Sequence, residues 1–391
     1  MPPTQRTQPA LTRTPHTSAP APHQPPHAAN RAQGTDKRMF SKKSAKKNLV
    51  GLDIGSSSIK AVELSGKPGN LVLLHLGHEA LQPDSVVDGQ IMELNSVSGT
   101  IASVFSTHQI KTERVAAGVS GSSVIVKNIL VPPMSDEELE ESIDWHAEEH
   151  IPFEIADVSL DYQVVGRSAE SLQVLLAACK RDFVANIKQA IQLAGRQPAV
   201  IDVDAFALQN CYEINYEPQA DDVVALLNIG AATMNINILQ GVRSVFTRDM
   251  SLGGNQYTAL LQKELGLTFE QAEAVKRGAP LPEGAAQKEI GPVLETVSDI
   301  LALEIQKTFD FYRATSDDGQ AVVRKILLSG GCSKLPGLAA YLASRFEMSV
   351  ELFDPFRKIK VDPRRFDIDY LREVTPEMAV AVGLALRGVD A

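Results

Sequence analysis

The stretch GLDIGSSSIKAVEL, residues 51–64, decides the fold. It begins as an apolar strand, breaks at Gly55 into a turn that contains three serines, and resumes as a second apolar strand at Ile59. Glycine lets a backbone approach a phosphate closely, and serine N–H and hydroxyl groups are phosphate donors. The stretch therefore predicts two strands joined by a phosphate-sized turn.

A carboxylate, Asp53, stands near the end of the first strand, where it would repel a phosphate. A divalent cation between them would remove the repulsion, because Mg²⁺ prefers carboxylate, water and phosphate oxygens. We expect Asp53 to hold Mg²⁺ through its water ligands and Lys60 to reach a phosphate oxygen. Taken alone this is a weak signal, because aspartate also commonly ends strands and caps turns.

The composition fits a protein of two ordinary domains. The chain has 391 residues, of which 44% are hydrophobic, and its three cysteines are isolated, so reduced thiols are expected. No apolar run approaches the roughly 18 residues of a membrane span, and the N-terminus lacks a secretory signal. We therefore expect a cytoplasmic protein.

Residues 1–46 differ in composition from the rest of the chain. They are rich in Pro, Gln, Thr, Ala and His, and carry eight Lys or Arg against one acid, Asp36. This composition predicts a disordered basic tail, with Met39 as an alternative start. The basic residues in 42–47 either contact anionic lipid or form a solvated linker. The total charge of −10 leaves −17 on the remaining chain, which argues against nucleic-acid binding.

Helical spacing of apolar residues predicts a helix over residues 95–109. Further helices are expected around residues 254–264, 268–278 and 287–313. In SDEELEESIDWHAEEH, Ser135 followed by Glu138 is the pattern of a capping box at the start of a helix.

The opening pattern returns about 175 residues later, in VVALLNIGAATMNINIL, residues 223–239. A third glycine turn follows an apolar strand in KILLSGGCSKLPGL, residues 325–338. Two copies of strand, turn and strand this far apart suit a duplicated two-domain fold rather than a solenoid. Three glycine turns at strand ends make one nucleotide site plausible.

In this order, the three segments resemble the phosphate 1, phosphate 2 and adenosine motifs of the actin-like ATPase superfamily. Within it, the chain from Lys47 to Gly388 resembles the PilM family of type IV pilus assembly proteins, relatives of the cell-division protein FtsA. The most specific stretch is LVPPMSDEELEESIDWHAEEHIPFEIADVSLDYQVVG, residues 130–166. The resemblance implies an α/β, actin-like (ribonuclease H-like) duplicated two-domain fold with an inserted 1C subdomain.

The resemblance also implies domain boundaries. They are subdomain 1A at 47–112 and 167–219, inserted subdomain 1C at 113–166, domain 2 at 220–374, and a C-terminal helix at 375–391 that returns to 1A.

Position by position, the resemblance implies a site for ATP and Mg²⁺ between the domains. Phosphates and metal would be met by Asp53, Gly55, Ser56, Ser57 and Lys60 in the first domain. From the second domain, the implied phosphate, ribose and adenine contacts are Gly230, Thr233, Gly253, Gly254, Glu273, Lys276, Gly330, Gly331 and Ser333.

One departure from the superfamily pattern concerns the second phosphate motif, where many members have an acid and this chain has Asn228. A neutral amide can bind a hydrated metal but cannot act as a base at pH 7. Asp204 is either a substitute acid or the N-cap of the following helix. ATP binding is therefore better supported than fast hydrolysis.

Two features of the insertion have other interpretations. HAEEH, residues 146–150, fits the HxxEH pattern of a zinc peptidase, but it lies on a short acidic helix and is better explained as a surface. Trp145 is either core of the insertion or part of an exposed peptide groove, and core packing is favoured.

The family likeness implies an ATP-binding scaffold of the type IV pilus inner-membrane platform. PilN would supply a cytoplasmic N-terminal peptide that docks between core and insertion. Contacts with other platform proteins and the pilus motor ATPases, and peripheral association with the inner membrane through partners, are also implied. The alternatives are a small-molecule kinase of the superfamily, which Asn228 disfavours, and an FtsA-like filament; homo-oligomers stay open.

Overall fold

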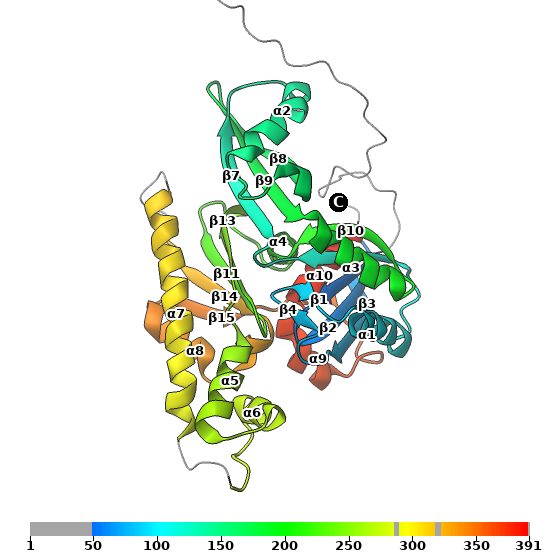
Figure 1. Ribbon diagram of the computed structural model, residues 1–391, viewed down its shortest axis with the longest axis vertical. Coiled ribbons are helices and arrows are strands. Elements are labelled where there is room, and N and C mark those ends of the chain that lie inside the picture. Colours follow the sequence, from blue (N-terminus) through cyan, green and yellow to red (C-terminus); the bar gives the residue numbers. More distant parts are fainter. Residues whose placement is uncertain (1–48, 285–288, 317–321, 390–391) are drawn as a thin grey trace, which may run out of the picture. The chain divides into compact units, whose positions relative to one another are not determined.

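The computed structural model describes residues 49–284, 289–316 and 322–389. The predicted tail, residues 1–46, lies outside the described residues. Figure 1 shows two mixed sheets, one built around β1 (Val50–Ile54) and the other around β11 (Val223–Ile229), with a third, smaller sheet beside them.

The first sheet has six strands and contains the stretch that opens the chain. β1 pairs antiparallel with β2, β2 antiparallel with β3, and β1 parallel with β6, which in turn pairs parallel with β10. In spatial order the strands are β10 (Gln197–Val203), β6 (Arg114–Val119), β1 (Val50–Ile54), β2 (Ser58–Ser65), β3 (Leu71–Ala80) and β16 (Ile359–Lys360).

The second sheet repeats this arrangement with five strands. Their order is β13 (Arg243–Met250), β12 (Met234–Gln240), β11 (Val223–Ile229), β14 (Lys325–Ser329) and β15 (Ser349–Leu352). β11 pairs antiparallel with β12 and parallel with β14, as β1 does with β2 and β6. The predicted duplicated α/β fold is therefore confirmed, and the structure adds that equivalent strands of the two sheets pair in the same directions.

Helices cover both sheets. On the first sheet they are α1 (Leu94–Thr107), α3 (Arg181–Leu193), α4 (Asp204–Asn215), α9 (Ile368–Val374) and α10 (Ala379–Ala385). On the second they are α5 (Gly254–Leu265), α7 (Ile290–Thr315) and α8 (Leu338–Phe346), and α6 (Phe269–Lys276) packs against α5. The predicted helices correspond to α1, α5, α6 and α7, and residues 287 and 288 of the last prediction lie outside the described residues.

The C-terminal helix α10 packs into the first domain at very short range. Gly51 on β1 lies so close to α10 that a Cβ there would stand 2.0 Å from the carbonyl oxygen of Ala381. Gly383 on α10 lies equally close to α4, and its Cβ would stand 1.8 Å from the carbonyl oxygen of Ala207. Glycine is required at both positions because the backbones approach too closely for any side chain.

The insertion is a three-stranded antiparallel sheet with one helix. β9 (Leu172–Lys180) lies between β7 (Val124–Val131) and β8 (Val158–Arg167), and α2 (Asp136–Glu148) covers one face. The predicted capping box is confirmed, since Glu138 N–H donates to the Ser135 hydroxyl at 3.2 Å and Ser135 N–H donates to the Glu138 carboxylate at 2.9 Å.

The strands of the insertion do not coincide with the predicted limits 113–166. β6 belongs to the six-stranded sheet, and β9 is the middle strand of the insertion, so this small sheet spans Val124 to Lys180. Likewise β16, inside the predicted domain 2 (220–374), joins the first sheet beside β3. The pattern of a strand in the sequence does not reveal which sheet it joins.

Trp145 lies on the outer face of α2, with 62% of its surface exposed. The favoured prediction of core packing was therefore wrong for this residue. Its ring stands edge-on to the ring of His146 at 4.8 Å between centroids. Leu139, Ile143 and Ala147 occupy the buried face instead.

Among the described residues, none of the helices combines the length and apolar character needed to cross a bilayer.

Candidate functional site

The three glycine turns stand at equivalent places in the two sheets. Each follows the carboxyl end of a central strand: Gly55 follows β1, Gly230 follows β11 and Gly330 follows β14. β11 and β14 are parallel neighbours, so the second and third turns lie side by side. The carboxyl edge of parallel strands is where α/β folds bind ligands.

The first turn contains a buried ion pair. Lys60 lies directly across the hairpin from Asp53, and its Nζ is 3.2 Å from Asp53 Oδ2. Burial of Lys60 disfavours its charge, but attraction by Asp53, Glu377 and Asp204 outweighs this and raises its pKa. Lys60 is therefore a fixed cation at the edge of the turn.

The donors of this turn are only partly used. Gly55 N–H donates to the carbonyl oxygen of Ser58 at 3.1 Å and closes the turn. Within the described part of the chain, the buried hydroxyl of Ser58 has no hydrogen-bond partner. Ser58 shares a strand face with Lys60, two residues on. A ligand with anionic oxygens at this turn would satisfy such a hydroxyl.

The second turn is braced by the start of α5. Gly254 N–H donates to the carbonyl oxygen of Gly230 at 2.9 Å, and Asn255 N–H donates to that of Ala231 at 2.7 Å. Gly253 lies so close that a Cβ would stand 2.5 Å from the Gly230 oxygen. These amides of α5 thus position the turn rather than face a phosphate themselves. Gly230 N–H donates to the carbonyl oxygen of Thr233 at 2.8 Å.

The third turn is held against the second. Gly330 has φ +85°, and a Cβ there would stand 2.4 Å from the carbonyl oxygen of Ile229, so glycine is required. Ser333 donates its hydroxyl to the carbonyl oxygen of Gly330 at 2.6 Å. Gly331 lies beside Glu377. These contacts fix the conformation of the turn, and the Ser333 hydroxyl proton is already used in a hydrogen bond within it.

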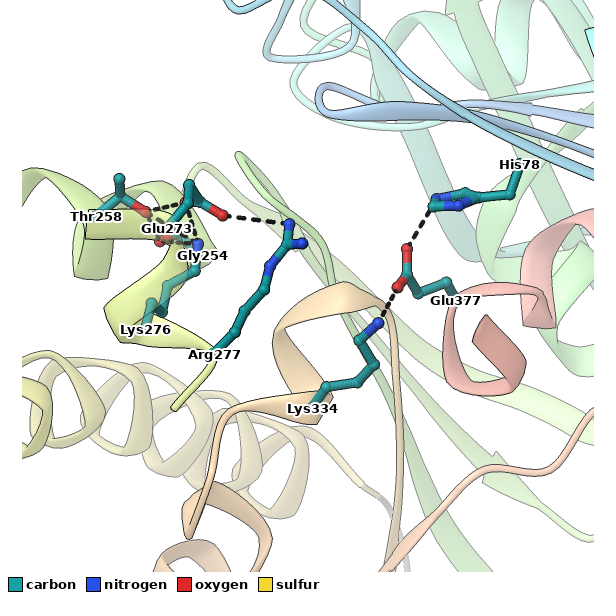
Figure 2. A network of polar contacts seen from close by, with 8 residues as sticks. All are labelled: His78, Gly254, Thr258, Glu273, Lys276, Arg277, Lys334 and Glu377. Carbon is teal, nitrogen blue, oxygen red and sulfur yellow. Dashed lines mark hydrogen bonds and ion pairs between the residues drawn. The ribbon is translucent and has the colours of Figure 1, made fainter. Parts of the chain in front are cut away.

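Glu273 and Lys276 of α6 form a network with α5, which Figure 2 shows. Lys276 contacts the carboxylate of Glu273 and donates to the Thr258 hydroxyl at 2.9 Å and to the Gly254 carbonyl oxygen at 3.3 Å. Both predicted ribose-contacting residues thus contact Thr258 on α5, and Lys276 also contacts Gly254, beside the second turn. Their contact with a ribose remains a prediction.

Asp204 is the first residue of α4, but it is not the cap of that helix. The cap position belongs to Val203, and no side chain caps this end. The carboxyl of Asp204 lies against Gly118, where a Cβ would stand 1.9 Å from its Oδ1, and it accepts a hydrogen bond from Ser120. Burial and the nearby carboxylates of Asp53 and Asp249 raise its pKa to about 8.

The second phosphate motif has Asn228 in place of an acid, but a carboxylate, Asp249, lies two strands away and is linked to Asn228 by hydrogen bonds. Asn228 donates its amide to Asn235 Oδ1 at 3.1 Å, and Asn235 donates to Asp249 Oδ1 at 2.8 Å. The other oxygen of Asp249 accepts the N–H of Gly121, in the first domain, at 2.6 Å. Burial raises the pKa of Asp249, against the effect of these hydrogen bonds. This chain of hydrogen bonds links the Asn228 amide to the Asp249 carboxylate, which contacts residues of both domains.

Glu377 joins the two domains on the other side of the site, as Figure 2 shows. Its carboxylate lies 3.3 Å from His78 Nε2 on β3 and 2.7 Å from Lys334 Nζ beside the third turn. Burial would raise its pKa, but His78, Lys60 and Lys334 together lower it to about 2. Glu377 is therefore ionised at neutral pH and balances cations from both sheets.

We expect Asp204→Asn to raise the melting temperature, with a gain that grows from pH 5 to pH 8. The folded carboxyl has a pKa of about 8 against an ordinary 3.8. Between these values the folded state holds a proton that the unfolded state has lost, so this group lowers stability as pH rises. Asparagine removes that cost. Thermal unfolding at several pH values tests this, with the exposed Asp369→Asn as control; parallel pH curves for Asp204→Asn and wild type would contradict it.

The residues present fit a nucleotide with Mg²⁺. The turns supply glycines at close approaches, a fixed lysine and an unpaired buried hydroxyl. Among the described residues, no three His, Cys, Asp or Glu side chains are grouped to hold a metal by themselves. Mg²⁺ here would therefore take one carboxylate, that of Asp53, with waters and phosphate oxygens as its other ligands, which is its usual coordination.

Sequence reasoning missed Asp249, Asn235 and Glu377. Asn235 alternates with apolar residues on a strand that is otherwise buried, and a buried amide of this kind needs partners, which is a detectable signal. Asp249 lies four residues before the predicted Gly253, but nothing in its neighbours indicates a contact with Gly121. No sequence pattern around Glu377 indicates that it contacts both sheets.

A duplicated pair of α/β domains, with three glycine turns at strand ends and one acid before the first, defines the class as an actin-like fold. The class agrees with EutJ from Carboxydothermus hydrogenoformans, whose solved structure superposes with a TM-score of 0.52 at 16% identity, covering 87% of this chain and 89% of EutJ. A family model described as type IV pilus assembly protein PilM matches residues 51–389, and the chain belongs to this family.

A chain in the solved PilM–PilN type IV pilus biogenesis complex is 32% identical to this one, with a TM-score of 0.79, and the match covers 88% of this chain and 100% of that chain. The cell-division protein FtsA of Escherichia coli (strain K12) is 24% identical over an alignment of 401 positions, gaps included, and the match covers 89% of this chain and 92% of FtsA. The predicted relationship to both families is confirmed.

Proposed function

We propose that this protein is a nucleotide-binding scaffold of the type IV pilus assembly platform, which binds ATP with Mg²⁺ between its domains and the cytoplasmic N-terminal peptide of PilN beside them. The observation that carries the proposal is the 32% identical chain in the PilM–PilN complex, matched over its whole length. Through PilN the protein would lie at the cytoplasmic face of the inner membrane. Other platform proteins and the motor ATPases are its further proposed partners.

A cavity of about 280 Å³ supports the proposed place of the peptide. It lies between helix α4 of the core and the open face of the insertion sheet, and the turn between β12 and β13 closes it from the second domain. Its lining is Asn128, Gln163, Val165, Leu175, Phe206, Gln209, Asn210, Glu213, Val242, Arg243, Ser244 and Arg387.

The cavity is tied to the nucleotide cleft through that turn. Gln209 on α4 donates to the carbonyl oxygen of Val242 at 2.7 Å, and β13 carries Asp249 at its other end. A movement of the second domain would therefore change both sites. Nucleotide would favour peptide binding only through a higher affinity for the arrangement that the peptide prefers.

Slow hydrolysis follows from the acids present. Asp204, with a pKa of about 8, holds its proton at neutral pH and is a poor general base. Asn228 is a neutral amide whose N–H already donates to Asn235 Oδ1. We propose that ATP acts mainly as a ligand that sets the domain arrangement. Slow hydrolysis of ATP would then end the ATP-bound arrangement.

The proposal is tested by titrating a fluorescent N-terminal peptide of PilN with the full chain in the presence of ATP and Mg²⁺. Asn128→Trp should weaken binding at least about tenfold, because Asn128 lines the cavity and a bulky ring there would fill it. Lys127→Trp is the matched control, since neighbouring strand residues point to opposite faces and Lys127 is also exposed. Full affinity in Asn128→Trp, or equal loss in both variants, would contradict the proposed place.

Deletion of residues 113–166 is not a usable test of the insertion. The deletion would remove β6 from the six-stranded sheet and leave β9 without β7 and β8. Loss of binding would then report misfolding, so single replacements on one strand are the sharper experiment.

A further inference from the structure

A second cavity, of about 410 Å³, lies at the edge of the second sheet opposite the glycine turns. Strands β11 and β14 begin at this edge, with Val223 and Lys325, and run toward the turns at their other ends. We call it the hinge cavity, because both chain segments that connect the two sheets line it. These segments follow α4, at Tyr216 and Glu217, and follow β15, at Arg357 and Lys358.

The hinge cavity is basic in an acidic protein. Its lining contains four cations, Arg324, Lys325, Arg357 and Lys358, against two acids, while the whole chain has a net charge of −10. One acid, Asp222, accepts the N–H of Gln219 at 3.2 Å. The other, Glu217, contacts Lys358 at 2.6 Å, and 81% of its side chain is exposed. Such an exposed ion pair contributes little free energy, so Glu217 competes only weakly with a ligand for Lys358.

The second connection, which carries Arg357 and Lys358, is held by the last residue of α4 and by the residue that follows it. Lys358 N–H donates to the Oδ1 of the fully buried Asn215 at 3.0 Å, and Asp354 N–H donates to the Tyr216 hydroxyl at 2.8 Å. The guanidinium of Arg357 lies over the Tyr216 ring, 4.9 Å from its centroid. Fixed backbone and a stacked guanidinium reduce the entropy cost of binding a ligand.

Two arginines are available for a ligand. Lys325 contacts Glu351 at 2.7 Å and Lys358 contacts Glu217, but Arg324 and Arg357 form no salt bridge with any residue in the described part of the chain. Arginine presents a planar fork of donors that matches phosphate oxygens, whereas lysine supplies a point charge. Two arginines and two lysines around one cavity form a set of hydrogen-bond donors suited to phosphate groups.

We propose that the hinge cavity binds a small anion carrying phosphate groups, a phosphomonoester or a diphosphate, at a site separate from the nucleotide cleft. The anion would join Arg324 and Lys325, at the start of β14, to Arg357 and Lys358 on the returning segment. It would thereby fix the returning segment against the start of β14 in the second sheet. This inference does not depend on ATP binding or on the PilN peptide.

The test is calorimetric titration of the full chain with pyrophosphate, in EDTA, so that Mg²⁺ is absent. We compare wild type, Arg324→Ala with Arg357→Ala, and a control with the same charge change, Arg313→Ala with Arg345→Ala, whose arginines are exposed on α7 and α8. Affinity should fall at least about tenfold in the first double variant and stay near wild type in the control. An unchanged melting temperature in both would show that the fold is intact.

Absence of saturable binding to wild type would overturn the proposal. So would equal affinity in the two double variants, which would place pyrophosphate in the nucleotide cleft or on general surface charge. A second arm with vesicles containing phosphatidic acid distinguishes the source of the phosphate. Co-sedimentation that depends on Arg324 and Arg357 assigns a lipid headgroup, and pyrophosphate binding without co-sedimentation assigns a soluble anion.

Discussion

Gly383→Ala is expected to lower the free energy of unfolding by at least about 3 kcal/mol, the upper part of the range for overpacked cores. The new Cβ would stand 1.8 Å from the carbonyl oxygen of Ala207, an atom of the α4 backbone that no rotamer change can move. Either α10 or α4 must shift, and α10 also packs on β1 at Gly51. Urea unfolding followed by circular dichroism measures the loss.

Gly99→Ala is the matched control, because Gly99 lies within α1 and a Cβ there meets nothing within 4 Å. Alanine is the better helix former by about 1 kcal/mol, so this change should be neutral or slightly stabilising. If Gly383→Ala unfolded at the same urea concentration as wild type, the close contact between α10 and α4 would be wrong.

The second large effect concerns nucleotide. ATP with Mg²⁺ at 100 times its Kd should stabilise the folded protein by about 2.7 kcal/mol, which appears as a rise of several degrees in melting temperature. Asp53→Ala should abolish this rise, since Asp53 is the carboxylate available to Mg²⁺ at the first turn. In the variant, only Lys60 would face the phosphates at this turn, and Mg²⁺ would have no carboxylate to hold it. Differential scanning fluorimetry with and without ligand measures both.

The shift on adding nucleotide, rather than the melting temperature itself, is the informative quantity. Asp53→Ala also removes the partner of a buried lysine and so lowers stability without ligand. Asp369→Ala, an exposed acid on α9, should keep the full shift. A wild-type protein that does not respond to ATP and Mg²⁺ would contradict the proposed cleft, and a full shift in Asp53→Ala would remove Asp53 from the metal.

The features that depend on neighbours in sequence could be predicted. The turn at Gly55 and its repeat at Gly230 follow from glycine and alternation, and the capping box at Ser135 follows from spacing. Contacts between distant segments could not be predicted this way. The pairing of Asp249 with Gly121 joins residues 128 positions apart, and no local pattern encodes it.

Asp204 shows the limit for a single residue. As the first residue of a helix it has the sequence pattern of an N-cap, yet the backbone places Val203 at the cap and turns the Asp204 carboxyl toward Gly118. Trp145 is the opposite case, because an amphipathic helix buries only one face and the acidic residues around Trp145 could have indicated the solvent side.

The order of the strands along the chain has a consequence for synthesis on the ribosome. The second sheet uses strands from one continuous segment, 223–352, whereas the first sheet takes strands from both sides of that segment. β1 emerges early, but α10, the helix that covers it at Gly51, emerges more than 300 residues later. The continuous domain can therefore complete its core before α10 is synthesised, while the first domain cannot complete its core until α10 has followed.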